Sequence, residues 1–204
     1  RMDDLGNGLF MGVARLSIVD VDPRANQPMY VDGGSYVISF NGEIYNYLEL
    51  RQELTGKGHR FRTTSDTEVL AHSYIEWGSD CLHKLNGMFA FVIYDRQRNT
   101  LFAARDRFGI KPLYLYQRGD KVAFASEIKQ FSALDSYESV ANESMVVDFI
   151  SWRIRNHTHQ TMFRDVHQLR GGQYLEVRLS EPLPPNLIDA AQSWYSYTRL
   201  VEIP

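Results

Sequence analysis

Short apolar runs, each bounded by turn residues, dominate the chain up to residue 125 and predict a strand-rich domain. Residues 87–94 form a continuous apolar run that is too short for a typical helix, and such a run is typical of a strand covered on both faces. Turns alternate with the apolar segments that follow, which predicts a meander of antiparallel hairpins. Strands are expected at residues 13–19, 36–40, 87–94, 101–104, 113–116, 122–125 and 174–179.

Helices are indicated at fewer places. Apolar residues spaced three and four apart follow Asn46, and Gly56 ends that pattern. The segment from Ser65 to Glu68 is typical of a capping box, in which the Ser65 side chain accepts a hydrogen bond from the Glu68 N–H and the Glu68 side chain reaches back. Helices that cover an antiparallel sheet indicate an α+β domain built in layers. The residues expected to open helices are Asn46, Ser65, Ser126 and Asn142.

Proline marks a linker-like segment near the end of the chain. Residues 180–185 contain Pro182, Pro184 and Pro185, and proline favours extended backbone. We therefore expect a domain at residues 1–180 and a linker at residues 181–204. Because the chain opens with Arg1 rather than methionine, a domain cut from a longer polypeptide is expected.

Composition and charge exclude several classes of protein. The 204 residues carry 22 Lys and Arg against 25 Asp and Glu, a net charge of -3, which argues against a broad nucleic-acid footprint and a polybasic membrane anchor. No apolar run approaches the roughly 18 residues of a transmembrane helix. We expect a cytoplasmic globular domain, because 44% of the residues are hydrophobic and can form a full core.

Cysteine and histidine give no sign of a disulfide or a metal site. Cys81 is the only cysteine, which excludes an internal disulfide, and its apolar neighbours predict a small buried side chain. The six histidines show no His-Glu-x-x-His spacing, so no metal is expected. The motifs of phosphate loops, dinucleotide-binding folds and serine hydrolases are absent as well.

Three sites carry candidate chemistry. Asn41 and Gly42 follow an expected strand, where a side-chain amide and a bare backbone N–H form either an oxyanion hole or a plain Asn-Gly turn. Arg15 lies in an apolar run, either as a bidentate partner for an α-carboxylate or as an edge-strand arginine in solvent. Asp66, in a first helical turn, either holds a ligand ammonium or interacts with the helix dipole. Together these are the parts needed to hydrolyse the side-chain amide of a free amino acid.

Ordered blocks of sequence extend these sites into a longer pattern. They occupy residues 15–20, 27–29, 40–46, 50–51, 58–59, 65–68, 77–78, 85–91, 104–114 and 124–129, and looser blocks follow at 161–166 and 171–175. Two of them read Phe40-Asn41-Gly42-Glu43-Ile44-Tyr45-Asn46 and Ala104-Arg105-Asp106-Arg107-Phe108-Gly109-Ile110-Lys111-Pro112-Leu113-Tyr114. In this order, from residue 15 to about residue 134, the chain resembles the glutaminase half of glutamine-hydrolysing asparagine synthetases.

The resemblance implies a class II glutamine amidotransferase domain with the N-terminal-nucleophile hydrolase fold, a four-layer αββα sandwich that here lacks its first strand. It also implies that the domain releases ammonia from glutamine, and that a synthetase domain of the same parent chain uses the ammonia for ATP-dependent amidation of aspartate. The domain itself would need no cofactor, whereas the synthetase domain would need ATP and Mg²⁺. Blocks 104–111 and 126–129 are expected to serve folding and inter-domain packing rather than catalysis. Glutamine and the synthetase domain are the expected partners, with no nucleic acid and no membrane.

The resemblance further implies roles for individual residues. Arg15 would bind the α-carboxylate of glutamine. Asn41 and Gly42 would donate hydrogen bonds to the oxyanion, and Glu43 and Asp66 would hold the α-amino group. The backbone expected beside the α-carboxylate belongs to Leu16, Ser17, Ile18 and Val19.

The nucleophile departs from the family pattern. In the family it is a cysteine at the mature N-terminus, whose own α-amino group helps to activate it. This chain begins with Arg1, no cysteine precedes Arg15, and Cys81 has no free amine. Truncation accounts for the difference, and the chain by itself is expected to bind glutamine poorly and to hydrolyse none. Without the first strand a sheet edge would stay open, which favours association of copies, for example as a homodimer.

Two alternatives remain open. The same fold could serve a related synthetase with a different carboxylate acceptor, since the acceptor pocket would lie outside this chain. The chain could instead be a non-catalytic, degenerate glutaminase domain that lost its nucleophile.

Overall fold

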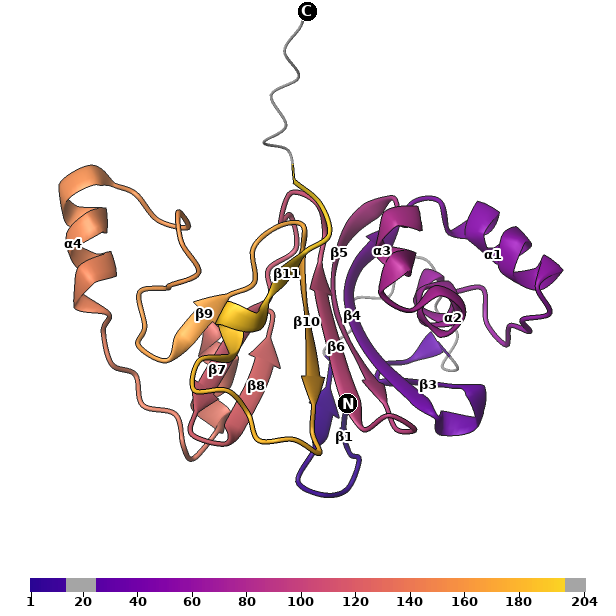
Figure 1. Cartoon of the computed structure of the whole chain (residues 1–204), viewed down its shortest axis with the longest axis horizontal. Coiled ribbons are helices and arrows are strands. Elements are labelled where there is room, and N and C mark those ends of the chain that lie inside the picture. The colour runs from indigo at the N-terminus through magenta and orange to yellow at the C-terminus, as the bar shows by residue number, and fades with distance from the viewer. Residues whose placement is uncertain (14–24, 197–204) are drawn as a thin grey trace, which may run out of the picture.

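The computed structural model describes residues 1–13 and 25–196 and shows an α+β domain (Figure 1). The helices are α1 (Tyr47–Gly56), α2 (Asp66–Trp77), α3 (Cys81–Lys84) and α4 (Glu143–Trp152), with short 3-10 helices at Asp32–Gly34, Gly78–Asp80, Ile128–Ala133 and Leu187–Ala190. The strands are β1 (Met2–Asp4), β2 (Phe10–Gly12), β3 (Met29–Val31), β4 (Tyr36–Ile44), β5 (Gly87–Asp95), β6 (Thr100–Arg105), β7 (Tyr114–Arg118), β8 (Lys121–Ala125), β9 (Val166–Gln168), β10 (Gln173–Arg178) and β11 (Gln192–Ser193).

The elements stack in layers, as the sequence predicts. A six-stranded antiparallel sheet has the order β11-β10-β6-β5-β4-β3, a three-stranded sheet has the order β8-β7-β9, and β1 pairs with β2. In Figure 1 the layers run from α4 through the smaller sheet and the larger sheet to α1, α2 and α3. This is the order of the expected αββα sandwich, and the α+β class is confirmed. The strand expected at residues 13–19 falls almost entirely on residues 14–24, outside the described residues.

Strand β5 explains why the larger sheet lies at the centre of the domain. Phe89, Phe91 and Ile93 project into a core shared with the three helices on that face. Ala90 and Tyr94 belong to a second core on the opposite face. Side chains alternate across a strand, so a continuous apolar run buries both faces. The strand predicted from residues 87–94 is confirmed.

Strand β4 is longer than the sequence pattern predicts. The expected end at residue 40 is wrong, because β4 pairs with β5 along its whole length, from Tyr36 opposite Asp95 to Ile44 opposite Gly87. An Asn-Gly pair disfavours a strand by itself, but cross-strand pairing and burial override that preference. Asn41 and Gly42 therefore lie inside a paired strand, and the plain turn is excluded as an explanation of this dipeptide.

The predicted meander is interrupted after β6. A hairpin between β6 and β7 is wrong, because β7 pairs with β8 and β9 in the smaller sheet. The chain crosses between the sheets in the loop at residues 106–113, which we call the crossing loop. Asp106 explains the shape of this loop: its carboxylate, on a residue that is 1% exposed, accepts four backbone hydrogen bonds of 2.9 to 3.2 Å. The donors are the N–H groups of Phe89, Phe108, Ile110 and Lys111.

Arg105 completes this arrangement from the preceding position. Its guanidinium donates to three carbonyl oxygens, those of Gly109, Lys111 and Leu169, at 2.5 to 2.7 Å. Neither charged side chain has an ion-pair partner among the described residues. The crossing loop is thus held by hydrogen bonds between two side chains and the backbone.

The predicted helix starts at Asn46, Ser65 and Asn142 are confirmed, but the expected capping box is not. The Ser65 side chain accepts from the Thr67 N–H, and the Glu68 carboxylate accepts from the Thr63 N–H, so the capping box between Ser65 and Glu68 is wrong. Asn46 precedes α1 without a capping bond, because its side chain donates to the Lys84 carbonyl oxygen at the end of α3 and accepts from the Asn86 N–H. The other two expected helices are present as Ile128–Ala133 and α4.

Residues beyond the proline-rich segment pack against the domain. Leu187 and Ile188 are both 2% exposed and lie in the second core, and β11 pairs with β10. The Trp194 indole N–H donates to the carbonyl oxygen of Arg105 at 3.2 Å. Part of the expected linker at 181–204 therefore contacts the domain, and the boundary at residue 180 stays a prediction.

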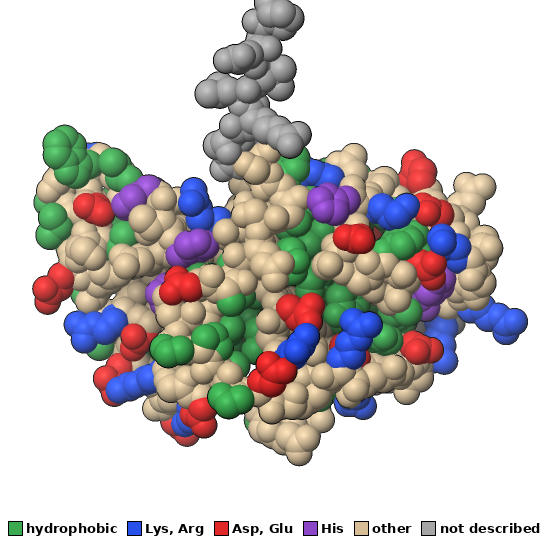
Figure 2. Space-filling model, in the orientation of Figure 1, with side chains coloured by type: hydrophobic (Ala, Val, Ile, Leu, Met, Phe, Trp, Pro, Cys, Tyr) green, Lys and Arg blue, Asp and Glu red, His purple; other side chains and the backbone are tan. Residues whose placement is uncertain are grey.

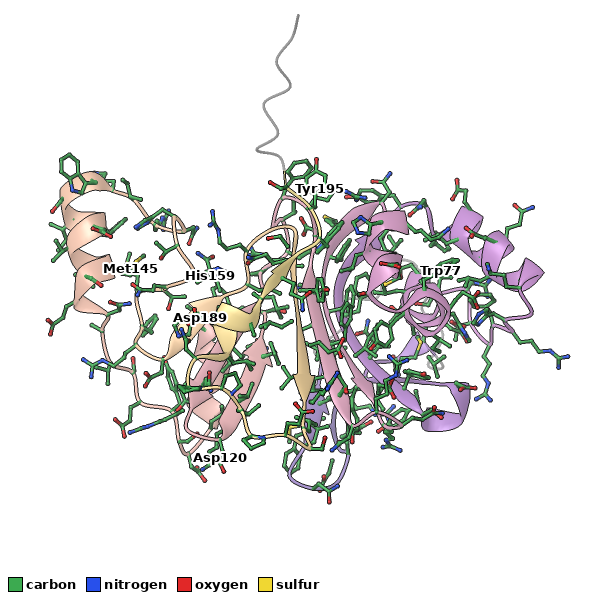
Figure 3. The ribbon with its side chains drawn as sticks, in the orientation of Figure 1. Trp77, Asp120, Met145, His159, Asp189 and Tyr195 are labelled. Atoms are coloured by element: carbon green, nitrogen blue, oxygen red, sulfur yellow. The ribbon has the colours of Figure 1, made fainter. Side chains whose placement is uncertain are left out.

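Helix α4 buries one of its side chains, that of Met145. Met145 is 2% exposed and points toward the loop that carries His159 (Figure 3). Val147, Ile150 and Trp152 are exposed, and apolar side chains gather over α4 on the surface in Figure 2. Within the described ranges, no helix is long and apolar enough to cross a membrane.

A pair of histidines joins α2 to the segment after α1. His59 Nδ1 lies 2.9 Å from His72 Nδ1, and His59 Nε2 lies 2.9 Å from the Glu76 carboxylate. Only one of the two facing nitrogens can carry a proton in this contact. Burial of His72, followed by the neighbouring His59, lowers the pKa of the His72 imidazole, whereas the nearby Glu68 carboxylate opposes that shift.

Acidification is expected to destabilise the domain through His72. In the unfolded chain the imidazole takes up a proton near pH 6.5, but folded His72 resists protonation, so the unfolded state binds more protons below that pH. The free energy of unfolding measured by urea should therefore fall as the pH is lowered from 7 to 5.5. His72→Gln should reduce the dependence of the free energy of unfolding on pH, whereas the exposed His157→Gln should not. If the pH dependence is unchanged in His72→Gln, other groups cause it.

Candidate functional site

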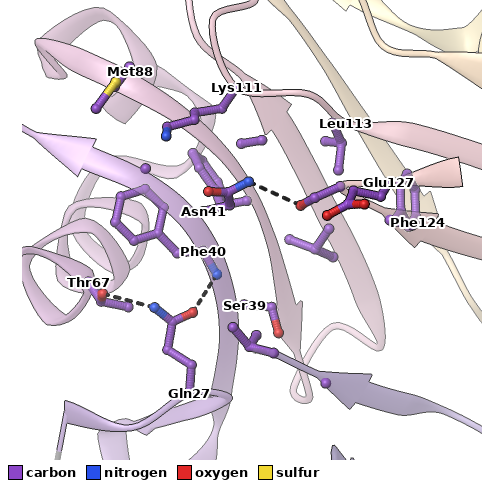
Figure 4. A pocket seen from close by; sticks show the side chains of 18 of the residues that line it. Gln27, Ser39, Phe40, Asn41, Thr67, Met88, Lys111, Leu113, Phe124 and Glu127 are labelled. Carbon is purple, nitrogen blue, oxygen red and sulfur yellow. Dashed lines mark hydrogen bonds between the residues drawn. The ribbon is translucent and has the colours of Figure 1, made fainter. Parts of the chain in front are cut away.

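A cavity of about 510 Å³ lies between the two sheets, beside the middle of β4 (Figure 4). This volume is in the range of small-molecule sites, and several polar groups converge on it. They come from strand β4, the start of α2, the segment before β3, the crossing loop and the chain that follows β8. The polar side chains that line the cavity belong to Gln27, Ser39, Asn41, Glu43, Asp66, Thr67, Lys111, Ser126, Glu127 and Gln130.

Asn41 presents its side-chain amide to the cavity from the centre of β4. Alternation along the strand places Ser39, Asn41 and Glu43 on the cavity face, while Phe40 and Ile44 pack into the core beneath the helices. The Asn41 Nδ2 donates to Ser126 Oγ at 3.2 Å, a contact between residues 85 apart in the sequence that is drawn in Figure 4. Ser126 thereby orients an amide whose N–H groups can serve as hydrogen-bond donors.

Gly42 is required by the close approach of β4 and β5. A Cβ atom at this position would lie 2.2 Å from the carbonyl oxygen of Met88 and 2.7 Å from the Cα of Phe89. Gly42 lines the cavity next to Asn41. Gly42 therefore lets β4 lie close to β5 at the position next to the Asn41 amide.

Two acidic residues line the same cavity. Asp66 is 5% exposed, and its carboxylate accepts from the Ile44 N–H at 3.0 Å, which ties the start of α2 to the end of β4. Burial raises the pKa of Asp66, the hydrogen bonds from Ile44 and Thr67 oppose that shift, and the negative charge of Glu43 adds to it. A cation placed between the two carboxylates would relieve both their repulsion and the cost of burying Asp66.

Sequence reasoning missed several residues of the site. Gln27 is 5% exposed, and its side chain accepts from the Phe40 N–H at 2.6 Å and donates to Thr67 Oγ1 at 3.4 Å, which joins β4 to α2 (Figure 4). Ser39 lines the cavity with a buried hydroxyl that has no hydrogen-bond partner among residues 1–13 and 25–196. Ser126 could have been found from its place directly after the expected strand 122–125, but the sequence carries no such signal for Ser39.

The structure brings together four of the predicted site residues. Asn41, Gly42, Glu43 and Asp66 all line the one cavity. Val13, the last described residue before the segment 14–24, lines it as well. The other predicted site residues, Arg15, Leu16, Ser17, Ile18 and Val19, lie outside the described residues.

Cys81 takes no part in this site. It is fully buried among Leu82 and Leu85, as its sequence context predicts, and burial raises the pKa of its thiol. The residues that line the cavity do not include it. In the described part of the chain, no group of three or more His, Cys, Asp or Glu side chains could hold a metal ion.

Known proteins are similar in sequence to most of this chain. The family model described as a glutamine amidotransferase domain matches residues 5–183. Asparagine synthetase (glutamine-hydrolyzing) 3 of Bacillus subtilis is 50% identical over 127 residues, which cover 61% of this chain and 20% of that protein. Asparagine synthetase (glutamine-hydrolyzing) 2 of the same organism is 39% identical over 170 residues, which cover 81% of this chain and 22% of that protein. The chain thus spans about a fifth of the length of these relatives.

The fold also occurs among solved structures. The structure titled as the allosteric regulatory enzyme of purine biosynthesis superposes with a TM-score of 0.58, over 84% of this chain and 32% of that chain. The two sequences are 21% identical, so the likeness concerns the fold alone.

Proposed function

This chain belongs to the glutamine amidotransferase domain family, and on that premise we propose that its cavity binds L-glutamine and holds the side-chain amide for hydrolysis to glutamate and ammonia. The observation that supports this proposal is the convergence of Asn41, Gly42, Glu43 and Asp66 on one cavity of suitable size. These residues supply two types of group, neutral donors and carboxylates, which match the two ends of glutamine.

The donors would act on the amide. When a nucleophile attacks the amide carbon, negative charge develops on its oxygen, and the Asn41 amide with the Gly42 backbone N–H would stabilise that charge. Each preorganised donor of this kind contributes roughly 10²- to 10³-fold in rate. The bond from Asn41 to Ser126 restricts the Asn41 side chain before the ligand arrives, so little reorganisation is needed.

The carboxylates would act on the other end of the ligand. The ammonium group of glutamine would lie between Glu43 and Asp66, and the positive charge would favour the ionised form of the buried Asp66 carboxylate. Arg15 would bind the α-carboxylate, as the family resemblance implies. A zwitterionic amino acid would then have each charged group matched.

We infer that the complete reaction belongs to a longer polypeptide. An N-terminal cysteine upstream would attack the amide carbon through its thiolate, ammonia would leave with a proton, and water would cleave the thioester to glutamate. The ammonia would amidate aspartate in a further domain that binds ATP and Mg²⁺. The names of the relatives, and the fifth of their length that this chain spans, support this larger assignment.

Substituting Asp66 with asparagine is expected to weaken glutamine binding about tenfold, because a neutral amide cannot neutralise the ligand ammonium. Asparagine retains an oxygen that can accept from the Ile44 N–H, so the helix start should be preserved. Binding can be measured on this chain by ¹⁵N chemical-shift titration with millimolar L-glutamine, a range that suits a weak ligand. The exposed Asp135→Asn is the matched control and should bind as the unsubstituted chain does.

The same substitution separates binding from folding in an intact synthetase. Asp66→Asn should reduce glutamine-dependent asparagine synthesis and leave synthesis from ammonium salts unchanged. Equal loss of both activities, or a melting temperature that falls with glutamine affinity, would assign Asp66 to folding instead.

A further inference from the structure

Gln27 is a buried polar residue to which the proposed reaction gives no role. It opens the sequence block 27–29 and is only 5% exposed. Burying a carboxamide costs free energy unless its groups are hydrogen-bonded, and here both ends have a partner. Its Oε1 accepts from the Phe40 N–H at 2.6 Å, and its Nε2 donates to Thr67 Oγ1 at 3.4 Å (Figure 4).

The bond to Phe40 takes the place of pairing between strands. The ladder of β3 and β4 ends with Met29 opposite Ile38. Two residues further along the same register Gln27 would face Phe40, but its side chain, rather than its backbone, accepts the Phe40 N–H. The carboxamide thus continues the pairing of β4 at the point where β3 has ended.

The Gly42 N–H points to this same edge of β4. Strand β4 has β5 on its other side, and along an antiparallel strand the N–H groups point alternately to one neighbour and to the other. The N–H groups of Phe40 and Ile44 point away from β5 and donate to side chains, those of Gln27 and Asp66. Gly42 lies midway between Phe40 and Ile44, so its N–H points the same way. The direction of the Gly42 N–H is therefore fixed by a side-chain contact on either side.

Gln27 also connects the proposed oxyanion donors to the carboxylates. Thr67, which accepts its second hydrogen bond, directly follows Asp66 at the start of α2. Phe40, which donates the first, directly precedes Asn41 in β4. One buried side chain therefore links the two sets of groups that the proposed function assigns to the two ends of glutamine.

We propose that Gln27 is a positioning residue for amide hydrolysis, which holds β4 at residues 40–44 so that the Gly42 N–H and the Asn41 amide face the developing oxyanion. This inference rests on the proposed function, because the two donors act only if an amide is attacked in this cavity. Donors aimed at charge that develops in the transition state raise kcat and change the affinity for the ground state little. Loss of Gln27 should therefore lower kcat rather than raise KM.

The test measures glutamate release from L-glutamine by the complete polypeptide that contains this chain. Gln27→Met keeps the length of the side chain but removes the amide, and it should lower kcat about tenfold while KM changes by less than about twofold. Gln27→Glu keeps an acceptor for the Phe40 N–H and should restore most of kcat. Gln27→Asn is a second variant, whose side chain is one methylene shorter and should show the same loss as Gln27→Met.

Gln168→Met is the matched control for the loss of a buried amide. Gln168 is also 5% exposed, and its Nε2 donates to the Thr158 carbonyl oxygen at 2.8 Å. It lies in β9 and does not line the cavity. Gln168→Met should lower the melting temperature and leave both kcat and KM for glutamine unchanged.

The possible failures are distinct. Equal loss of kcat in Gln27→Met and Gln168→Met would assign Gln27 to stability alone and overturn the inference. An unchanged kcat, a rise in KM alone, or a Gln27→Glu variant as slow as Gln27→Met would overturn it as well. In all of these cases the unsubstituted polypeptide still hydrolyses glutamine, so the proposed function survives. If the unsubstituted polypeptide hydrolyses no glutamine, the proposed function fails and the role of Gln27 fails with it.

Discussion

Replacing Gly42 with alanine is expected to lower the free energy of unfolding by about 3 kcal/mol or more and to distort β4 beside Asn41. The new Cβ would lie 2.2 Å from the Met88 carbonyl oxygen and 2.7 Å from the Phe89 Cα, and both are backbone atoms of the central strand β5. Neither can move without breaking the ladder between β4 and β5, so the cost is at the upper end for overpacking. Asn41, next to the substitution, would be displaced with the strand.

Thermal unfolding of Gly42→Ala measures the effect directly. A loss of about 3 kcal/mol corresponds to a melting temperature roughly 6 to 12 °C lower for a domain of this size. Gly56→Ala is the matched control, because a Cβ at Gly56 meets no atom within 4 Å and alanine favours the helix that it ends. If Gly42→Ala and Gly56→Ala have the same melting temperature, the two strands do not approach each other as closely as the structure indicates.

Asp106→Asn is expected to cost about 4 kcal/mol, the larger of the two losses, although it changes only one atom of the side chain. Each oxygen of the Asp106 carboxylate accepts hydrogen bonds from two backbone N–H groups. In asparagine an NH2 group replaces one of these oxygens, and because it is itself a donor, two backbone N–H groups lose their acceptor. A buried N–H group without an acceptor costs about 1 to 3 kcal/mol, and the lost carboxylate charge weakens the remaining bonds.

Urea unfolding of Asp106→Asn measures the loss in the free energy of unfolding, and ¹⁵N chemical shifts show which backbone amides the substitution affects. The amide signals of Phe108, Ile110 and Lys111 should move most, since their bonds to Asp106 are altered. Asp120→Asn, in the exposed turn between β7 and β8 (Figure 3), is the control and should leave stability unchanged. Stability equal to that of the control would mean that solvent, rather than Asp106, satisfies these N–H groups.

Much of the site could be predicted from sequence because its chemistry is local. Asn41, Gly42 and Glu43 are consecutive, and Asp66 begins a helix whose start is marked by Ser65. Residue types and helix signals indicate Asn41, Gly42 and Asp66 as candidates, whereas Glu43 is indicated only by the family resemblance. Their arrangement around one cavity depends on the hydrogen bond that the Ile44 N–H donates to the Asp66 carboxylate, which joins residues 22 apart and has no sequence signature.

The parts that could not be predicted depend on distant or backbone contacts. Ser126 bonds Asn41 across 85 residues, and Gln27 acts through a backbone N–H that any residue could offer. The separation of β6 from β7 follows from the Asp106 carboxylate, which accepts backbone groups whatever their side chains. A pattern of apolar and polar residues contains no information on such contacts.

The way the crossing loop is held determines which of its residues can be substituted. Its shape depends on the side chains of Arg105 and Asp106 acting on the main chain, so the outward positions contribute little to it. Ile110, which is 58% exposed, is bonded through its N–H and not through its side chain. Mutations could accumulate at such a position over generations, or be introduced by a protein engineer, while the conformation beneath it is inherited intact.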